Sequence, residues 1–232
     1  MLARSTAVLT ALLALVAWAA VAPAAVTVHV LVEGYVAPIE GRGFVPGQQD
    51  DGARKVASTV VLVKAEGATI VVDPGMVAEN AAIPAALARH GVKPADVTHV
   101  FISHHHPDHT VRIGMFPTAK VIDFIGEYEG DVWWDHPNPY TVAPGVRVLR
   151  TPGHTKQDAT LLVEAEDGVY AMTHLWWSEQ SLGQPDPLAE DPAALEKHRE
   201  QILQLADWIV PGHGKRFANP RRAAANRAAD PQ

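Results

Sequence analysis

The sequence contains no cysteine among its 232 residues. This absence excludes disulfide bridges, thiolate zinc sites and a cysteine nucleophile. A Gly-x-Ser-x-Gly elbow is also missing, so a serine hydrolase of that type is not indicated. Charge is sparse, at 19% of residues with a formal net charge of −7, and there is no basic patch. Since phosphate contacts dominate the affinity of nucleic-acid binders, the composition predicts no nucleic-acid partner.

Charge is missing altogether from a long stretch near the N-terminus, between Arg4 and Glu33. An apolar run over 7–18 is followed by the small-x-small motif Ala-Pro-Ala at 22–24. This pattern is typical of a secretory signal peptide over residues 1–24, which predicts a secreted or periplasmic protein. The apolar run approaches the length of a membrane span. If the segment is not cleaved, the alternative is that it anchors the protein, and the chain would then contact a membrane only through this N-terminal segment.

Histidine, by contrast, is concentrated in one place. Segment 103–110 reads Ser-His-His-His-Pro-Asp-His-Thr and follows the apolar run 97–102. Alternate residues of an extended segment point the same way, so His104 and His106 can bind one metal while His105 faces away. Imidazole and carboxylate ligands suit zinc, and metal sites of this kind with an open position are catalytic.

Further ligands follow along the chain. Pro107 turns the chain, so that Asp108 and His109 can face a second metal. His154 and His213 each follow a Pro-Gly pair at the end of an apolar run. A loose histidine-rich tail would neither follow a buried strand nor have such distant counterparts, and the pattern therefore predicts a two-metal site.

With these motifs in family order, the chain resembles the metallo-β-lactamase superfamily of metallohydrolases over about residues 26–217. The resemblance implies two Zn²⁺ ions, with iron or manganese as alternatives. It implies that the first metal is held by His104, His106 and His154, and the second by Asp108, His109 and His213. It also implies that Asp73, in the Val-Val-Asp-Pro-Gly segment, supports a metal-binding histidine from behind.

One position departs from the commonest family pattern. Where many members carry a Gly-Asp whose carboxylate bridges the metals, the predicted strand 168–172 leads into Thr173 and His174. A neutral imidazole offers one lone pair to one metal. His174 is therefore expected to ligate the second metal, or to hydrogen-bond to the bound hydroxide, without bridging. The alternative is that His174 packs beside Trp176 and Trp177.

The resemblance further implies a metal-dependent hydrolase, in which a metal-bound hydroxide attacks an ester, lactone, β-lactam or related bond of a small molecule. Asp108 is the expected catalytic residue, which orients the nucleophile and accepts its proton. The candidate walls of the substrate pocket are aromatic: Trp176, Trp177, Trp133, Trp134, Tyr128 and Tyr140. Because Trp176 and Trp177 follow the site strand directly, we expect one of them to face the cleft. An apolar rim suits a neutral substrate.

Two other functions stay open. Segment 109–117 also resembles the small metallo-β-lactamase-domain-containing-protein-1 type, which implies a phosphodiesterase or nuclease of the same fold. The histidine at position 174 leaves open a metal-binding module with little turnover.

Alternating apolar runs and turn signals predict an α+β protein. The expected strands are 26–32, 59–63, 69–72, 97–102, 120–125, 146–149, 159–164, 168–172 and 208–210. Helices are expected over 77–90, which Pro84 interrupts, and over 193–205, which Asp191 and Pro192 begin. The resemblance implies an αββα sandwich, in which two mixed β-sheets pack face to face with helices outside. The predicted hydrolase domain covers 25–218, and a polar Ala/Arg tail covers 219–232.

Overall fold

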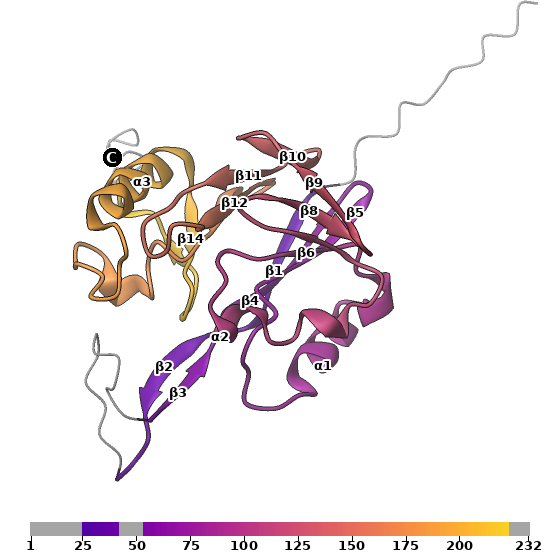
Figure 1. Cartoon of the computed structure of the whole chain (residues 1–232), viewed down its shortest axis with the longest axis horizontal. Helices are drawn as coiled ribbons and strands as arrows, with labels where there is room; N and C mark the ends of the chain where they lie inside the picture. Colours follow the sequence, from indigo (N-terminus) through magenta and orange to yellow (C-terminus); the bar gives the residue numbers. More distant parts are fainter. Residues whose placement is uncertain (1–24, 42–52, 223–232) are drawn as a thin grey trace, which may run out of the picture.

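The structure is a computed structural model and describes residues 25–41 and 53–222 (Figure 1). The predicted signal peptide and the last ten residues of the tail lie outside the described residues. Within the described part of the chain, no helix has the length and apolar character needed to cross a membrane.

The first sheet is mixed and has seven strands in the order β1-β4-β5-β6-β7-β8-β9. Its strands are β1 (Thr27–Val32), β4 (Val60–Ala65), β5 (Ala68–Val72), β6 (His99–Phe101), β7 (Lys120–Ile122), β8 (Gly126–Glu129) and β9 (Val132–Asp135). Strands β5, β6 and β7 run parallel to one another, whereas the other neighbours are antiparallel.

The second sheet has six strands in the order β10-β11-β12-β13-β14-β15. Its strands are β10 (Tyr140–Ala143), β11 (Val146–Arg150), β12 (Ala159–Ala165), β13 (Gly168–Met172), β14 (Trp208–Val210) and β15 (Phe217–Ala218). A separate two-stranded arm of β2 (Tyr35–Pro38) and β3 (Arg54–Ala57) projects from the body of the molecule (Figure 1).

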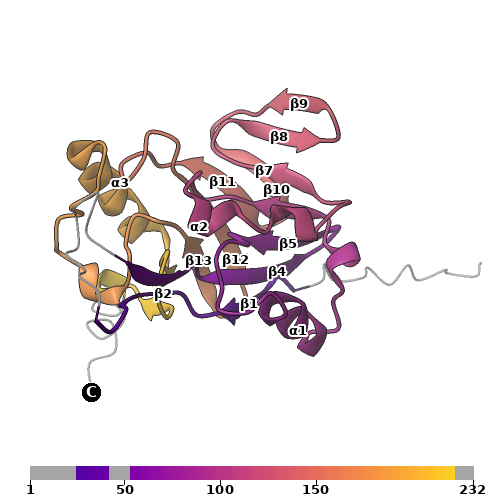
Figure 2. The same cartoon turned by 60° about the horizontal axis from the view of Figure 1, so that its bottom comes forward.

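Three apolar clusters show how the layers pack. The central cluster joins the two sheets through side chains such as Val63 and Ile70 of the first and Leu161 and Val163 of the second. A second cluster packs α1 (Ala82–Arg89) on the outer face of the first sheet, and a third packs α3 (Pro192–Leu205) on the outer face of the second. The order helix, sheet, sheet, helix confirms the predicted αββα sandwich, with α1 and α3 far apart in Figure 2.

The two predicted helices are present, and the first is shorter than expected. Helix α1 begins at Ala82 rather than at position 77, which places Pro84 in the first turn, where its missing N–H costs no intrahelical bond. Helix α3 begins at Pro192, and the Asp191 side chain accepts a hydrogen bond from the Ala194 amide at 2.9 Å.

All nine predicted strands are found; β13 and β14 have the predicted bounds, and the other seven have shifted ends. Strand β7 ends at Ile122 rather than at position 125, because the Asp123 carboxylate accepts the amides of Ile125 and Gly126 and so turns the chain. Six further strands, β2, β3, β8, β9, β10 and β15, were not predicted from the sequence. Short helical turns lie between these elements at Pro94–Asp96, Pro107–Thr110 (α2), Ile113–Met115 and Glu179–Ser181.

Candidate metal centre

The histidines converge because the strands that precede them end at the same edge of the sandwich. Strand β13 is parallel to β14, so their carboxyl ends meet and bring His174 within 5.1 Å of His213, between ring centroids. Strand β11 leads to His154 on the same side, since β11 and β13 both run antiparallel to β12. From the first sheet, β6 ends just before the loop that carries His104, and α2 follows, with Pro107 at its first position.

The structure brings the three residues predicted for the first metal together. His106 Nδ1 lies 3.0 Å from His104 Nε2 and 3.2 Å from His154 Nε2. We call these three side chains the first triad. His104 and His154 are buried, whereas His106 is exposed and stands at the mouth of the site.

The residues predicted for the second metal also meet, and we call them the second triad. Asp108 Oδ2 lies 3.5 Å from His109 Nε2 and 3.4 Å from His213 Nε2. The two Nε2 atoms are 3.5 Å apart. Both histidines are buried, and the Asp108 side chain keeps 21% of its surface exposed. The second triad therefore combines two imidazoles with one carboxylate that solvent can reach.

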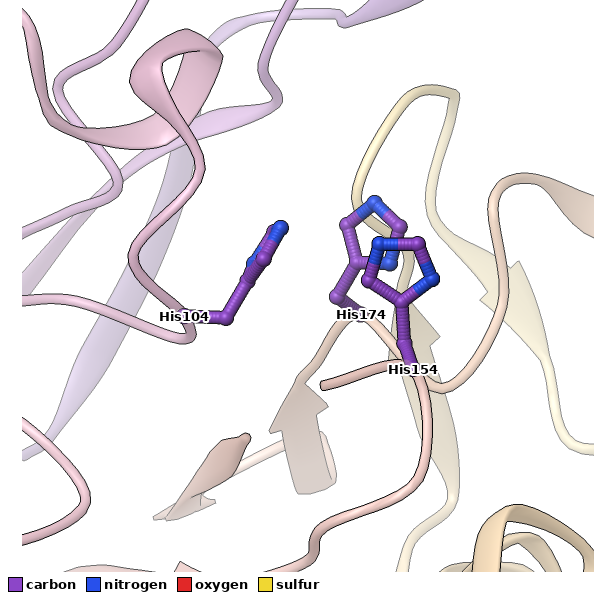
Figure 3. A group of neighbouring side chains, drawn as sticks. All are labelled: His104, His154 and His174. Carbon is purple, nitrogen blue, oxygen red and sulfur yellow. The ribbon is translucent and has the colours of Figure 1, made fainter. Parts of the chain in front are cut away.

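His174 lies between the triads. Its ligand atom falls within 4.8 Å of those of His104 and His154, and also of those of His109 and His213. Figure 3 shows the His174 and His154 rings side by side, facing His104 across the site. Its Nδ1 is buried and has no hydrogen-bond partner. The alternative that His174 merely packs beside the two tryptophans is not what the structure shows.

Asp73 supports both triads through hydrogen bonds. Its Oδ2 accepts from His109 Nδ1 at 2.9 Å and from Ser103 Oγ at 2.6 Å. Ser103 Oγ in turn lies 3.2 Å from His104 Nδ1, so it can accept the proton of that nitrogen. Asp73 has a φ of 47°, and the left-handed region is one that Asp tolerates better than most residues. The expected role of Asp73 behind a metal-binding histidine agrees with this geometry.

Two further supports were not predicted from the sequence. Asp186 is buried, and its Oδ2 accepts a hydrogen bond from His154 Nδ1 at 2.7 Å. The Ala57 carbonyl oxygen accepts from His213 Nδ1 at 2.9 Å. With the Nδ1 protons of His109, His154 and His213 donated to acceptors, each Nε2 keeps its lone pair and turns it toward the centre.

Burial keeps most of these imidazoles neutral. Burial, and then the neighbouring histidines, hold the pKa values of His104 and His174 well below the ordinary value. Burial and His109 lower the pKa of His213 to about 4. Burial also acts to lower the pKa of His109, but the Asp73 carboxylate outweighs it and raises that pKa. Neutral imidazole is the form that binds a metal.

Glycines allow this close packing at two positions. A Cβ on Gly212 would lie 2.3 Å from His174 Cδ2, and a Cβ on Gly75 would lie 1.6 Å from the Asp108 carbonyl oxygen. Each glycine therefore lets a loop approach a ligand-bearing segment more closely than any other residue would permit.

The side chains fit a pair of divalent metal ions. Nitrogen atoms with free lone pairs converge from His104, His154, His109 and His213, with the exposed His106 and the Asp108 carboxylate at the mouth. His174 Nδ1 adds a buried nitrogen without a hydrogen-bond partner, as expected of a residue whose own partner would be a bound metal or a group that the metal holds. A set of imidazoles and one carboxylate is typical of a zinc site.

Of the two tryptophan candidates, only Trp177 lies beside the histidines of the site. Its ring centroid lies 5.2 Å from that of His213 and 5.3 Å from that of His174. The prediction for Trp176 was wrong: this side chain is 1% exposed and packs under α3, with the Arg199 guanidinium over its ring. The chain has left the strand before these residues, so strand alternation no longer fixes which of the two faces the site.

His105 faces away from both triads, as predicted. Its Nε2 pairs with the buried Asp123 Oδ2 at 2.9 Å, on the side of β7. The hydrogen bond to Asp123 is the main reason why the pKa of His105 is raised.

Comparisons with known proteins agree with this geometry. The family model described as the metallo-beta-lactamase superfamily matches residues 53–175. Metallo-beta-lactamase domain-containing protein 1 of Xenopus laevis is 34% identical over 199 residues, which cover 82% of this chain and 81% of that protein.

The similarity to lactonases covers a smaller part of the chain in the sequence comparison than in the structural comparison. An N-acyl homoserine lactonase of Bacillus cereus is 34% identical over 103 residues, which cover 38% of this chain and 41% of that enzyme. The structure of a dizinc quorum-quenching lactonase with its product N-hexanoyl-L-homoserine superposes with a TM-score of 0.54 at 19% identity, covering 71% of this chain and 74% of that one.

Proposed function

The chain belongs to the metallo-β-lactamase superfamily of metal-dependent hydrolases, and we propose that it hydrolyses a neutral small-molecule lactone or ester with two zinc ions. The observation that carries the proposal is the convergence of two triads, with His174 between them, at one edge of the sandwich. The local similarity to a lactonase supports the choice of substrate class.

In this proposal the first triad, His104, His106 and His154, holds one zinc ion, and the second triad, Asp108, His109 and His213, holds the other. When bound, such a metal pair supplies a water of near-neutral pKa and an electrophile for a carbonyl oxygen. His174 would be a ligand of the second zinc ion and would not bridge the two ions, since a neutral imidazole has a single lone pair.

The chain's own groups orient the reactants and move protons. Asp108 Oδ2 stands at the partly exposed mouth, where it can orient the attacking water and accept its proton. Asp73 and Asp186 fix the tautomers of His109 and His154, so that the ligating nitrogens stay aimed at the centre. The Trp177 ring covers His174 and His213, which keeps bulk water from that side of the site.

A substrate panel tests the reaction class. The purified protein is assayed on a γ-lactone, an aryl ester, a chromogenic cephalosporin and an aryl phosphodiester, each with and without a chelator. We expect chelator-sensitive hydrolysis of the lactone or the ester. Preferred turnover of the phosphodiester would favour the nuclease-type alternative, and no turnover of any substrate by the zinc-loaded protein would favour a metal-binding module.

We also propose that the enzyme acts outside the cytoplasm, on the basis of the signal-peptide pattern in residues 1–24. Expressed in a bacterium with its own N-terminus, the mature protein should begin at or near Ala25. Recovery of cytoplasmic full-length protein that begins at Met1 would contradict this proposal, and a membrane-bound full-length chain would favour the anchor.

A further inference from the structure

A pocket of about 620 Å³ lies beside the metal centre and contains none of the triad residues. Its lining comes from β7, β8 and β9 on one side. Val121 pairs across the strands with Tyr128, and Tyr128 pairs with Trp133, so these three side chains form one row on the same face of the sheet. Thr110 of α2 and Ile113 line the pocket as well.

The row is apolar and open to solvent. Trp133 is 57% exposed, and its ring packs edge-on against Tyr128 with 5.1 Å between ring centroids. Ile125 and Ile113 extend the apolar lining. Large apolar side chains gathered around an open pocket mark a binding surface rather than a packing core. The β8–β9 hairpin that carries Trp133 stands at the outer end of the sheet (Figure 2).

A buried carboxylate holds the polar rim of this pocket in place. Asp123 Oδ2 accepts from His105 Nε2 at 2.9 Å, and both of its oxygens lie 3.0 Å from the Tyr128 hydroxyl. Its Oδ1 also accepts the amides of Ile125 and Gly126. One residue therefore fixes the position of His105, Tyr128 and the turn between β7 and β8, so the pocket is preformed.

The pocket continues toward the first triad. A smaller pocket of about 350 Å³ is lined by His106 of that triad, together with His105, Thr155, Lys156, Gln157 and Glu190. His105 and Gln157 line both pockets. A ligand can therefore extend from His106, past these two shared side chains, to Trp133.

We propose that the larger pocket binds the alkyl or aryl group of a neutral substrate whose carbonyl lies at the metal centre, and that Trp133 and Tyr128 set the preference for that group. This inference rests on the proposed lactone or ester hydrolysis. The apolar row contributes through burial of the substrate chain, so affinity should grow with chain length.

A series of γ-lactones with alkyl chains of one to eight carbons tests the proposal. For the zinc-loaded protein, we expect KM to fall about two- to fourfold for each added methylene until the pocket is filled. Trp133→Ala should raise KM for the octyl lactone about five- to tenfold and leave the methyl lactone unchanged. Ile113→Trp, which reduces the volume of the pocket, should act in the same direction.

Trp134→Ala is the matched control. Trp134 follows Trp133 on the same edge strand and is 46% exposed, but it points to the other face, where Lys120 lies over its ring. This variant should keep the chain-length dependence of the wild type. Equal KM values for methyl and octyl lactones in the wild type, or equal effects of the two tryptophan variants, would overturn the pocket assignment while leaving lactone hydrolysis intact.

Binding of decanamide to the metal-free protein, measured by calorimetry, separates this inference from the proposed reaction. Wild type and Trp134→Ala should bind decanamide, and Trp133→Ala should bind it at least fivefold more weakly. That result, in a protein that hydrolyses no lactone or ester, would support the pocket and reject the reaction. A dimer that Trp133→Ala dissociates, without decanamide binding in the wild type, would assign the pocket to a second copy of the chain and overturn the proposal.

Discussion

The first and second triads are neighbours, with the ring centroids of His104 and His109 4.3 Å apart, yet they differ in charge and in the exposure of one histidine. The first consists of imidazoles alone, and its His106 is exposed at the mouth. The second contains the Asp108 carboxylate, and its His109 is fully buried against Asp73. With the same divalent ion bound in each triad, the neutral imidazoles of the first would leave the charge of the ion unchanged, whereas the Asp108 carboxylate of the second would lower the net charge of that site by one unit.

The difference distinguishes a histidine that contributes to the stability of the fold from one that contributes only to metal binding. His109 belongs to a hydrogen-bonded unit in the protein interior with Asp73 and Ser103, so it contributes to stability as well as to metal binding. His106 has no comparable support from behind and serves the centre alone. Substitutions in the two triads should therefore have different consequences.

The largest expected effect is on activity. His106→Ala should lower kcat/KM about a thousandfold or more and remove the metal of the first triad, since two remaining imidazoles bind it poorly. His105→Ala is the control for metal content, because His105 is the adjacent exposed histidine and bonds to Asp123 instead. Full activity and full metal content in His106→Ala would show that the first triad does not bind a metal as proposed.

The next effect concerns the free energy of unfolding and compares one histidine of each triad. In the metal-free protein, His109→Ala should lower the free energy of unfolding by about 3 kcal/mol, because it removes the imidazole partner of the buried Asp73 carboxylate and leaves a cavity in the interior. His106→Ala should change it by less than about 0.5 kcal/mol, as expected of an exposed side chain. Denaturant titration measures both, and equal losses would mean that His109 is no more a part of the core than His106.

His174 lies between the triads, and its variants show which one it serves. His174→Ala should weaken zinc binding at the second triad about tenfold or more while sparing the first. His174→Asp should hold two zinc ions at least as tightly as the wild type, because a carboxylate can span both ions and neutralise one charge. Its activity should fall, since the bound water becomes less acidic. Zinc titration with a competing chelator compares the three proteins. Equal second-site affinity in all three would show that His174 is not a ligand.

The smallest expected effect is a pH dependence of the metal-free protein. Burial lowers the pKa values of His104, His174 and His213, so the unfolded chain binds protons before the folded one, and stability should be lost as the pH falls below about 6.5. His109, whose pKa is raised, opposes this trend. Asp158 also opposes it below pH 6, since burial raises its pKa to about 6.

The lowered values outweigh the opposing ones of His105, His109 and Asp158, because the pKa values of His104 and His174 lie well below the ordinary value and burial also lowers those of His29, His99 and His106. The melting temperature of the metal-free protein should therefore fall steadily from pH 7.5 to pH 5.5. A melting temperature that rises or stays level over this range would contradict neutral packing of the site histidines. The zinc-loaded protein serves as the control, since bound metal keeps these nitrogens from binding protons until the ion dissociates.

The sequence predicts the triads well because their signals are local. His104, His106, Asp108 and His109 lie in one loop, and the Pro-Gly-His turns place the other two histidines at strand ends. The partner of His154, Asp186, lies in a loop 32 residues away without a motif, and only the packed fold brings the two together.

The same reasoning explains the errors elsewhere. Strand alternation ends at Met172, so it could not show that Trp177 faces the centre while Trp176 joins the core. Strand β8 is short and has glutamates at alternate positions, and the four residues of β9 are all exposed at the edge of the sheet, so neither has the buried apolar run that identified the central strands. The sequence therefore named Trp133 as a candidate pocket wall but could not predict the hairpin that places it beside Tyr128.

The most direct test of the two-triad account is native mass spectrometry of the metal-free chain titrated with zinc, on the wild type, His106→Ala and His213→Ala. The account predicts two bound zinc ions in the wild type and one in each variant, because each substitution disables one triad and leaves the other intact. A wild type that saturates with one zinc ion, or a His213→Ala chain that still binds two, would contradict it.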